Sequence, residues 1–262
     1  TPLFVPTEDF YRIDTALAIP QIDVSTWKLS VDGLVESPTS FTYDDIVNRP
    51  LFESDITISC VSNEVGGDLV GNARWLGCRL DDLLDEAGIR LAADQIVGWS
   101  VDGWSGGFPV EVLDGRDAMV AIGMNGDLLN AEHGFPARLI IPGVYGYVSA
   151  TKWLDRIELT TFADFSGFWI PRGWAAKAPV KVQSRIDRPR PGGSISAGDY
   201  QIAGVAWAPI DGIAKVEVQV GKGPWMNATL GPDVGAAAWR QWWVTWDATP
   251  GEHTVRVRAT NG

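Results

Sequence analysis

The chain has 262 residues, of which 45% are hydrophobic and 21% are charged. This length allows one large domain or two ordinary ones, and the composition is that of a folded globular protein, which excludes a disordered chain. Asp and Glu outnumber Lys and Arg by 33 to 21, and the formal net charge of −12 argues against nucleic acid as a partner, because it repels a phosphate backbone. A local group of basic side chains can still bind a small anion.

The first part of the chain mixes strand patterns with short helix patterns. A helix is expected after Thr42, a candidate N-cap followed by acidic residues, with Pro50 as its stop. A second helix is expected over residues 80–88, where apolar residues recur at helical spacing before a terminal glycine. These patterns predict an α+β fold, a mixed α/β domain over residues 1–177, with strands at 27–33, 55–60, 96–101, 118–124 and 137–141.

Helical patterns disappear near residue 178, and alternating strands with Pro- and Gly-containing turns continue to the end of the chain. The remaining length of about 85 residues is close to that of an immunoglobulin-like fold. The sequence therefore predicts an all-β sandwich over residues 178–262, a kind of domain that by itself indicates binding or dimerisation. Its strands are expected at 180–186, 200–207, 214–220, 239–246 and 254–260.

No stretch approaches the roughly 20 consecutive apolar residues that cross a bilayer, and the start lacks the basic and then apolar pattern of a signal peptide. The sequence as given therefore predicts a soluble chain. It begins at Thr1 rather than Met and stops at Gly262 directly after a predicted strand, so we expect an excised fragment of a longer gene product.

Cys60 is the first candidate for chemistry, because the strand over residues 55–60 delivers it into a Gly-rich loop. Two cysteines and two histidines cannot form an all-cysteine zinc site and lack the spacing of a mixed one. A disulfide between Cys60 and Cys78 is the structural alternative, and Cys78 could also pack as a small apolar residue. His133 as a base for Cys60 would give a cysteine protease. A non-catalytic binding protein is a third alternative.

The usual motifs of other enzyme classes are missing: the sequence contains no Gly-x-Ser-x-Gly, Walker or His-Glu-x-x-His motif. Segments in order along nearly the whole chain instead resemble the sulfite-oxidase-like molybdopterin oxidoreductases. Residues 59–63 (Ser-Cys-Val-Ser-Asn) are similar to that family's cysteine region, and residues 133–138 (His-Gly-Phe-Pro-Ala-Arg) are similar to its pterin-binding region. Further matching segments are 10–14, 71–75, 80–84, 125–126, 142–146 and 152–153, and the terminal sandwich, with residues 204–207 (Gly-Val-Ala-Trp), resembles the family's dimerisation domain.

The resemblance implies a molybdopterin cofactor whose molybdenum is bound by the Cys60 thiolate, a soft ligand suited to such a metal. It also implies that Arg138 binds the phosphate of the pterin bidentately, that Lys152 adds a point charge beside it, and that His133 donates a hydrogen bond to ring or phosphate atoms of the pterin. Arg12 and an aromatic ring would flank the pterin. The full set of expected cofactor-binding residues is Phe10, Tyr11, Arg12, Cys60, Asn63, Asp102, His133, Arg138, Ser149, Thr151 and Lys152.

The chain departs from the sulfite enzymes of this family where they hold the substrate. Those enzymes follow the cysteine region with Asn-Arg-Arg, whereas this chain has Glu64 and Val65 after Asn63, and Trp104 stands where they have a tyrosine. A carboxylate repels sulfite, so we expect a neutral or cationic substrate such as an S-oxide or N-oxide. The expected substrate pocket contains Glu64, Trp104 and Phe108.

The resemblance has further implications for partners and location. Nothing in the chain resembles a haem-binding module, so we expect electron transfer to a separate partner or to a missing part of the gene product. A small-molecule substrate is the other expected partner, and a homodimer is expected from the second domain. The family includes exported and membrane-tethered members, which implies an extracytoplasmic enzyme, with any membrane tether supplied by segments absent from this chain.

Overall fold

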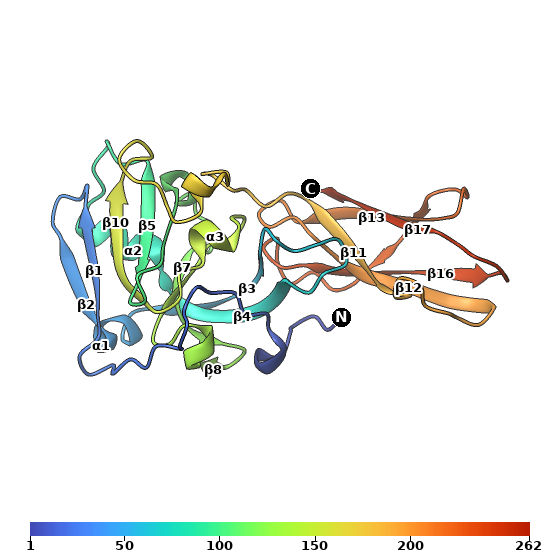
Figure 1. Cartoon of the computed structure of the whole chain (residues 1–262), viewed down its shortest axis with the longest axis horizontal. Coiled ribbons are helices and arrows are strands. Elements are labelled where there is room, and N and C mark those ends of the chain that lie inside the picture. The colour runs from blue at the N-terminus through green and yellow to red at the C-terminus, as the bar shows by residue number, and fades with distance from the viewer.

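The computed structural model describes residues 1–262 and is mostly β, with few helices. Figure 1 shows two lobes: the sheets of the first 160 or so residues form one, and strands β11 to β17 form the other. The expected mixture of helix and strand is confirmed, although strands dominate. The helices are α1 (Tyr43–Val47), α2 (Leu80–Ala87), α3 (Gly146–Ser149) and the short 3-10 turns Thr7–Asp9, Val110–Val112, Ala131–His133 and Ile170–Arg172.

The first sheet contains five strands, and only its β1–β10 pair is parallel. Its apolar face packs on α1 and α2 in the largest core cluster, which contains Leu29, Leu83 and Ile157. In order across the sheet the strands are β2 (Thr39–Thr42), β1 (Lys28–Gly33), β10 (Leu154–Thr160), β5 (Gln95–Ser100) and β6 (Ser105–Pro109).

The second sheet is antiparallel and contains the longest strand of this lobe, β4, which curves toward the other lobe (Figure 1). One face of this second sheet covers a smaller core around Phe10, Trp75 and Ile140. The strands run in the order β3 (Leu51–Ser59), β4 (Val70–Arg79), β7 (Met119–Met124) and β8 (Asp127–Leu128), and β9 (Arg138–Ile140) also pairs with β7.

The second lobe consists of two antiparallel sheets with a shared apolar core that includes Ile202, Val216 and Trp242. The five strands expected here are all present, within a few residues of their expected ends. One sheet has the order β11 (Gln183–Arg188), β12 (Gly198–Trp207), β16 (Arg240–Ala248) and β15 (Thr229–Leu230), and the other has β14 (Met226–Asn227), β13 (Ile213–Val220) and β17 (Val255–Asn261).

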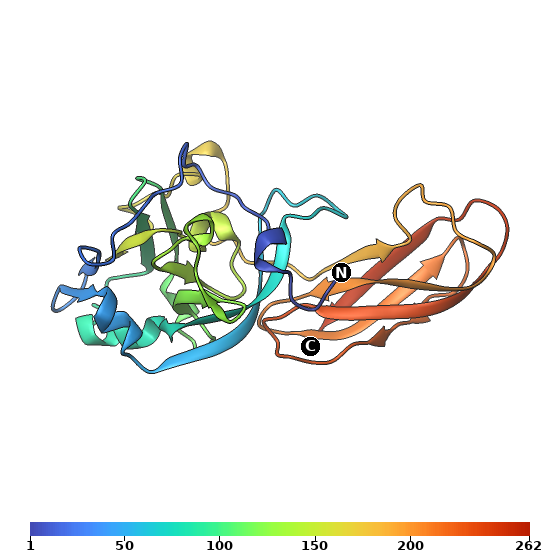
Figure 2. The same ribbon diagram turned by 90° about the horizontal axis from the view of Figure 1, so that it is seen from below.

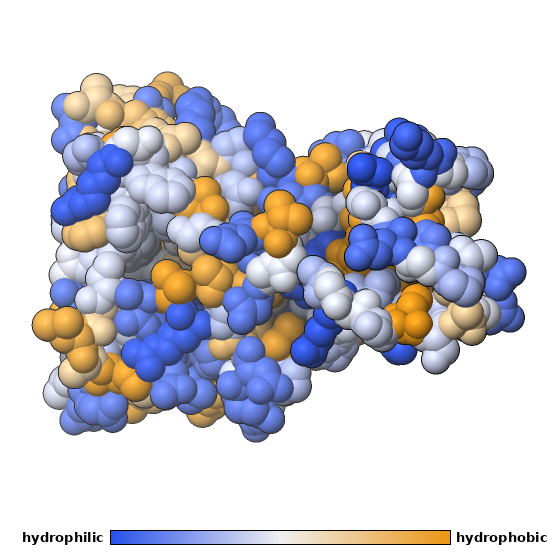
Figure 3. All heavy atoms as spheres, turned by 45° about the vertical axis from the view of Figure 1, so that its right-hand side comes forward, coloured by the Kyte–Doolittle hydropathy of each residue, from blue (hydrophilic) through white to orange (hydrophobic).

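The two lobes meet where β3 and β4 approach the second lobe, as the view from below in Figure 2 makes clear. Val70 of β4 shares a buried cluster with Trp207 and Trp239 of the second lobe. On the face drawn in Figure 3, apolar side chains are interspersed with polar ones, and a waist separates the lobes. The structure contains no helix with the length and apolar character needed to span a membrane.

Candidate functional site

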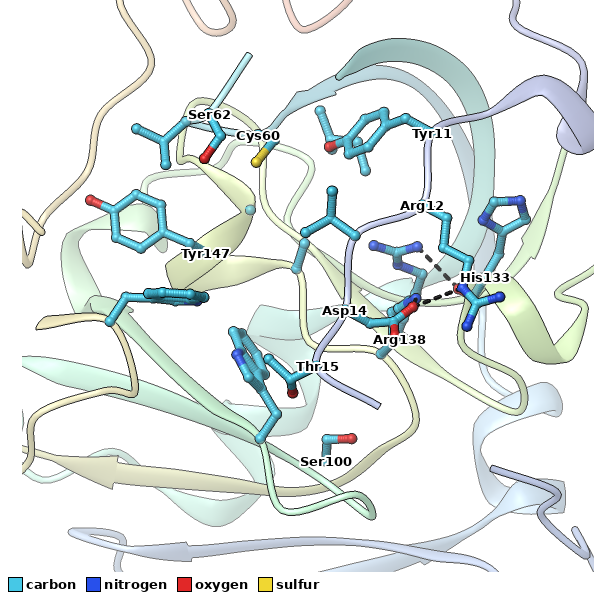
Figure 4. A pocket seen from close by; sticks show the side chains of 18 of the residues that line it. Tyr11, Arg12, Asp14, Thr15, Cys60, Ser62, Ser100, His133, Arg138 and Tyr147 are labelled. Atoms are coloured by element: carbon cyan, nitrogen blue, oxygen red, sulfur yellow. Dashed lines mark hydrogen bonds and ion pairs between the residues drawn. The ribbon is translucent and has the colours of Figure 1, made fainter. Parts of the chain in front are cut away.

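Cys60 lies one residue beyond the end of β3, at the start of the loop that leads to β4. Its backbone N–H donates to the Leu69 carbonyl at 2.9 Å, and the Asn63 side chain accepts from Leu69 N–H at 2.9 Å. These bonds close the loop behind Cys60. The thiol is half-buried and points into a pocket (Figure 4).

Cys60 and Cys78 are both free thiols, so the disulfide alternative is wrong. Cys78 pairs with Leu51 at the far end of the β3–β4 ladder, whereas Cys60 follows the near end, and nine strand residues separate the two by roughly 25 Å. Cys78 is 1% exposed, and burial raises the pKa of its thiol to about 11. It packs as a small apolar residue.

The pocket gathers residues from distant parts of the sequence into one hollow with about 980 Å³ of empty space, its open mouth included. Of the residues expected from sequence, those in its lining are Tyr11, Arg12, Cys60, Asp102, Trp104, His133, Arg138 and Lys152.

Arg138, on β9, is the buried cation of this pocket. Its side chain is stacked over the Trp75 ring at 5.1 Å and donates from Nη1 to the His133 carbonyl at 3.0 Å. Its Nε has no hydrogen-bond partner, and no carboxylate lies within 4 Å of the guanidinium. Burial lowers the pKa of Arg138 to about 10. An unpaired buried guanidinium facing a cavity suits an anionic ligand, because an anion would supply the missing counter-charge.

Lys152 is the second cation and already has an acidic partner. Its Nζ lies 2.6 Å from Asp14 Oδ2 and 3.1 Å from the Glu132 carbonyl. Burial lowers the pKa of Lys152 to about 8, against the opposing effect of Asp14. Arg12 also binds Asp14, with Nε 2.8 Å from the same oxygen. Asp14 thus joins two of the predicted cofactor-binding cations, a role that sequence reasoning missed although residues 10–14 were singled out.

His133 is buried beside these cations, and its Nε2 lies 2.8 Å from the Thr7 carbonyl. A carbonyl only accepts, so Nε2 carries the proton and donates. Burial lowers the pKa of His133, which favours the neutral ring. The expected donation to a cofactor would therefore need the imidazolium form, since Nδ1 of the neutral ring is an acceptor. The structure contains no hydrogen bond between Cys60 and His133, so it lends no support to a Cys–His catalytic pair.

The N-terminal segment crosses this pocket and is anchored by Phe10. The Phe10 ring is buried edge-on against Trp75 and His133, and it covers Gly71 so closely that a Cβ at that position would lie 2.6 Å from the ring. Tyr11 follows it into the pocket, with its hydroxyl directed to the Cys60 side (Figure 4). Burial raises the pKa of Tyr11, so its hydroxyl stays protonated.

Six expected site residues lie outside the lining. Ser149 and Thr151 use their hydroxyls on the backbone carbonyls of Val144 and Gly98. Phe108 of β6, expected in the substrate pocket, is instead fully buried in the largest core cluster. The other three residues are Phe10, Asn63 and Glu64. Phe10 is buried where the N-terminal segment packs on the core, Asn63 forms a hydrogen bond within its own loop, and Glu64 lies on the exposed tip of that loop.

The lining also contains aromatic residues that sequence reasoning did not assign to it, namely Tyr147, Trp153, Trp169 and Trp174. The only local signal was two tryptophans around an Ile-Pro-Arg-Gly turn. No three His, Cys, Asp or Glu side chains converge in the structure, so a metal next to Cys60 would take its other ligands from a cofactor.

Comparisons with known proteins agree with this geometry. The family model described as oxidoreductase molybdopterin binding domain matches residues 16–169. The chain is 29% identical to mitochondrial sulfite oxidase of Homo sapiens over 92% of this chain and 53% of that protein. It is 33% identical to the uncharacterized oxidoreductase YuiH of Bacillus subtilis over 58% of this chain and 74% of that protein. The chain thus spans about half the length of the curated sulfite oxidases that it matches.

The crystal structure of the sulfane dehydrogenase SoxCD from Paracoccus pantotrophus superposes with a TM-score of 0.80 at 25% identity, covering 93% of this chain and 69% of that one. The fold, the family model and the relatives therefore give one result. The chain belongs to the oxidoreductase molybdopterin-binding family of the sulfite oxidase type, and a molybdenum–molybdopterin cofactor follows from that membership.

Proposed function

We propose that this chain is the molybdopterin-binding part of an oxidoreductase that performs oxygen-atom transfer or related two-electron chemistry on a small substrate other than sulfite. One observation carries the proposal. The buried Arg138 guanidinium lacks a counter-charge and faces the same cavity as the Cys60 thiol. An anionic cofactor that also binds a thiolate ligand satisfies both groups.

Within this proposal the chain's own residues have distinct tasks. Cys60 would hold the molybdenum through its thiolate, and Arg138 and Lys152 would bind the anionic tail of the cofactor. The protonated Tyr11 hydroxyl can donate a hydrogen bond on the Cys60 side of the cavity. When bound, the molybdenum pterin supplies the two-electron redox centre. We propose a separate electron-transfer partner for this centre.

The case against sulfite is now different from the one that the sequence suggested. Glu64 is exposed on its loop and does not line the cavity, so its charge cannot be the main obstacle. Of the three basic residues in the lining, Arg12 and Lys152 already bind Asp14, and Arg138 is buried. No further cation is left for a substrate oxyanion. Sulfite turnover with a low KM would contradict this part of the proposal.

We further propose that residues 178–262 form an immunoglobulin-like sandwich that makes a homodimer, and that residues 1–177 form the catalytic domain. The two facing antiparallel sheets of the second lobe support this assignment. An extracytoplasmic location is the accompanying proposal. Light scattering at micromolar concentration should give twice the chain mass, and a monomer would remove the dimer.

The first experiment is metal and pterin analysis of protein made in a host that synthesises the cofactor. We expect close to one molybdenum and one pterin per chain. In Cys60→Ser the visible absorption that comes from thiolate ligation should disappear. Cys78→Ala is the matched control, because Cys78 lies in the core, and its metal and absorption should match the parent. Well-folded parent protein without metal and pterin would favour the non-catalytic binding protein instead.

A further inference from the structure

Four aromatic side chains line one end of the cavity: Trp104 from the β5–β6 hairpin, Tyr147 from α3, and Trp169 and Trp174 from the segment after β10. All four are half-buried. The ring centroids of Tyr147 and Trp174 are 5.5 Å apart, and those of Trp169 and Trp174 are 6.3 Å apart, both at steep angles. In Figure 4, Tyr147 lies well away from Arg138 and His133. We call these four residues the aromatic end.

Local contacts hold these rings in place. The Tyr147 hydroxyl donates to the Ala175 carbonyl at 2.6 Å, which ties α3 to the segment that contains Trp169 and Trp174. Trp104 lies across Gly106, where an added Cβ would come within 2.5 Å of its ring. A side chain at position 106 would therefore displace the indole. The aromatic end is preorganised in the chain itself, which lowers the entropic cost of binding a ligand.

No basic residue of the cavity lining belongs to the aromatic end, and Arg172, between Trp169 and Trp174, stacks on Phe168 at 3.9 Å outside the lining. The basic residues of the lining are Arg12, Arg138 and Lys152, two of them bound to Asp14 and the third buried beside His133. Ring faces carry negative potential, so they attract alkyl groups that bear partial positive charge and disfavour an oxyanion. The acidic Asp102 also belongs to the lining.

The polar atoms that remain here suit a neutral acceptor. The Tyr147 hydroxyl already donates to a carbonyl, but the indole N–H groups of Trp104, Trp169 and Trp174 make no hydrogen bond within the protein. An indole N–H only donates. The aromatic end thus combines apolar faces with free, uncharged donors, in the same cavity as Cys60.

We infer that the aromatic end is the substrate-specificity site of this cavity, and that it takes an uncharged organic oxide through a methyl or aryl group next to the reacting heteroatom. This inference rests on the proposed function, narrows the neutral or cationic substrate expected from the sequence to an uncharged organic oxide, and adds three residues, Tyr147, Trp169 and Trp174. A small inorganic oxyanion such as sulfite lacks the apolar group that the rings would hold.

The test is calorimetric titration of the cofactor-loaded protein with methyl phenyl sulfoxide and, separately, with sulfite. We expect the sulfoxide to bind at least tenfold more tightly than sulfite. Trp169→Ala and Trp174→Ala should each weaken sulfoxide binding by about tenfold. Trp225→Ala, the same change in the second lobe, is the matched control and should bind as the parent does. Trp174→Phe keeps an aromatic face and should recover most of the affinity.

Molybdenum and pterin are measured in the same samples, so that the two proposals can fail separately. Parent protein that lacks both but still binds the sulfoxide at the tryptophans contradicts the proposed function and leaves the specificity site standing. Loaded protein that binds sulfite more tightly than the sulfoxide overturns the inference. So does sulfoxide affinity that is unchanged in Trp169→Ala, the variant that decides the question if Trp174→Ala does not fold.

Discussion

Arg138 is the residue of the pocket whose charge is buried without an acidic partner. The guanidinium is 5% exposed, has no acidic partner and leaves Nε without a hydrogen bond. Such a group costs stability in the cofactor-free protein and is useful only when an anion binds. The first lobe therefore holds a destabilising cation in place for a ligand.

Replacing Arg138 should have opposite effects on stability and on cofactor retention. We expect Arg138→Met to raise the free energy of unfolding of the cofactor-free protein by about 1–3 kcal/mol, because an apolar side chain of similar length removes the unpaired charge. The same variant should lose most of its pterin. Chemical denaturation and pterin fluorescence measure the two effects. A variant that is less stable than the parent would show that the cation is satisfied without a ligand.

The lowered pKa of Lys152 predicts how the stability of the cofactor-free protein changes with pH. Burial lowers that pKa to about 8, below the ordinary 10.5, so the folded lysine loses its proton before the unfolded one does. Stability of the cofactor-free protein should therefore rise between about pH 8 and pH 10, by up to about 3 kcal/mol. Thermal unfolding across this range, compared with Lys152→Met, measures the contribution. Parallel curves for the two proteins would contradict the prediction.

At the scale of single elements, local sequence patterns were sufficient to predict helices α1 and α2. The helix expected after Thr42 is α1, and Thr42 is its N-cap in a capping box with Asp45. The helix expected over residues 80–88 is α2, ended by Gly88 at φ 70°. In both cases the cap residue satisfies backbone groups that the helix itself leaves unpaired, so a few consecutive residues determine the boundary.

The capping box of α1 gives a prediction at this scale. Thr42→Ala removes the acceptor for the Asp45 N–H, a bond of 3.2 Å, and should lower the free energy of unfolding by about 1 kcal/mol. Thr42→Ser keeps the hydroxyl and should lose much less. Urea denaturation of both variants checks the difference, and equal losses would indicate that the methyl group rather than the cap matters.

At the scale of the whole molecule, the second lobe supports the strand that delivers Cys60. Thr57 on β3 donates its backbone N–H to the Ala237 carbonyl at 3.0 Å, and its hydroxyl accepts a hydrogen bond from the Trp239 backbone N–H at 2.7 Å. Arg185 of β11 also donates to the Gly67 carbonyl, at 2.6 Å, in the loop after Cys60. The lobe that resembles a binding module is thus part of the support of the site.

Thr57→Val tests this coupling between the lobes. Valine has the same shape but leaves the buried Trp239 backbone N–H without its acceptor and the buried Asn72 Oδ1 without its donor, so we expect a loss of about 1–3 kcal/mol in the free energy of unfolding. Thr245→Val, an exposed threonine on β16, is the matched control and should change it by less than about 0.5 kcal/mol. Equal effects of the two substitutions would mean that the contact between the lobes contributes little.

The sequence by itself determined the elements with local signals, the change to an all-β second part, and the order of segments that resembles one family. The place of Cys60 at a strand end before a Gly-rich loop singled it out, whereas Arg138 and Lys152 were named only through the resemblance to one family. β4 was missed as a strand, since its Gly71 and Gly77 weaken the pattern, and both lie where a side chain would clash with a neighbour.

Only the tertiary structure decided which of the candidate residues meet. It separated the two cysteines to opposite ends of a hairpin, turned Phe108 into the core and left Glu64 on a loop tip. It also brought Asp14 to Lys152 across 138 positions and grouped four aromatic rings from three segments. These outcomes depend on strand register and long-range packing, and no short stretch of sequence encodes a contact between segments that far apart.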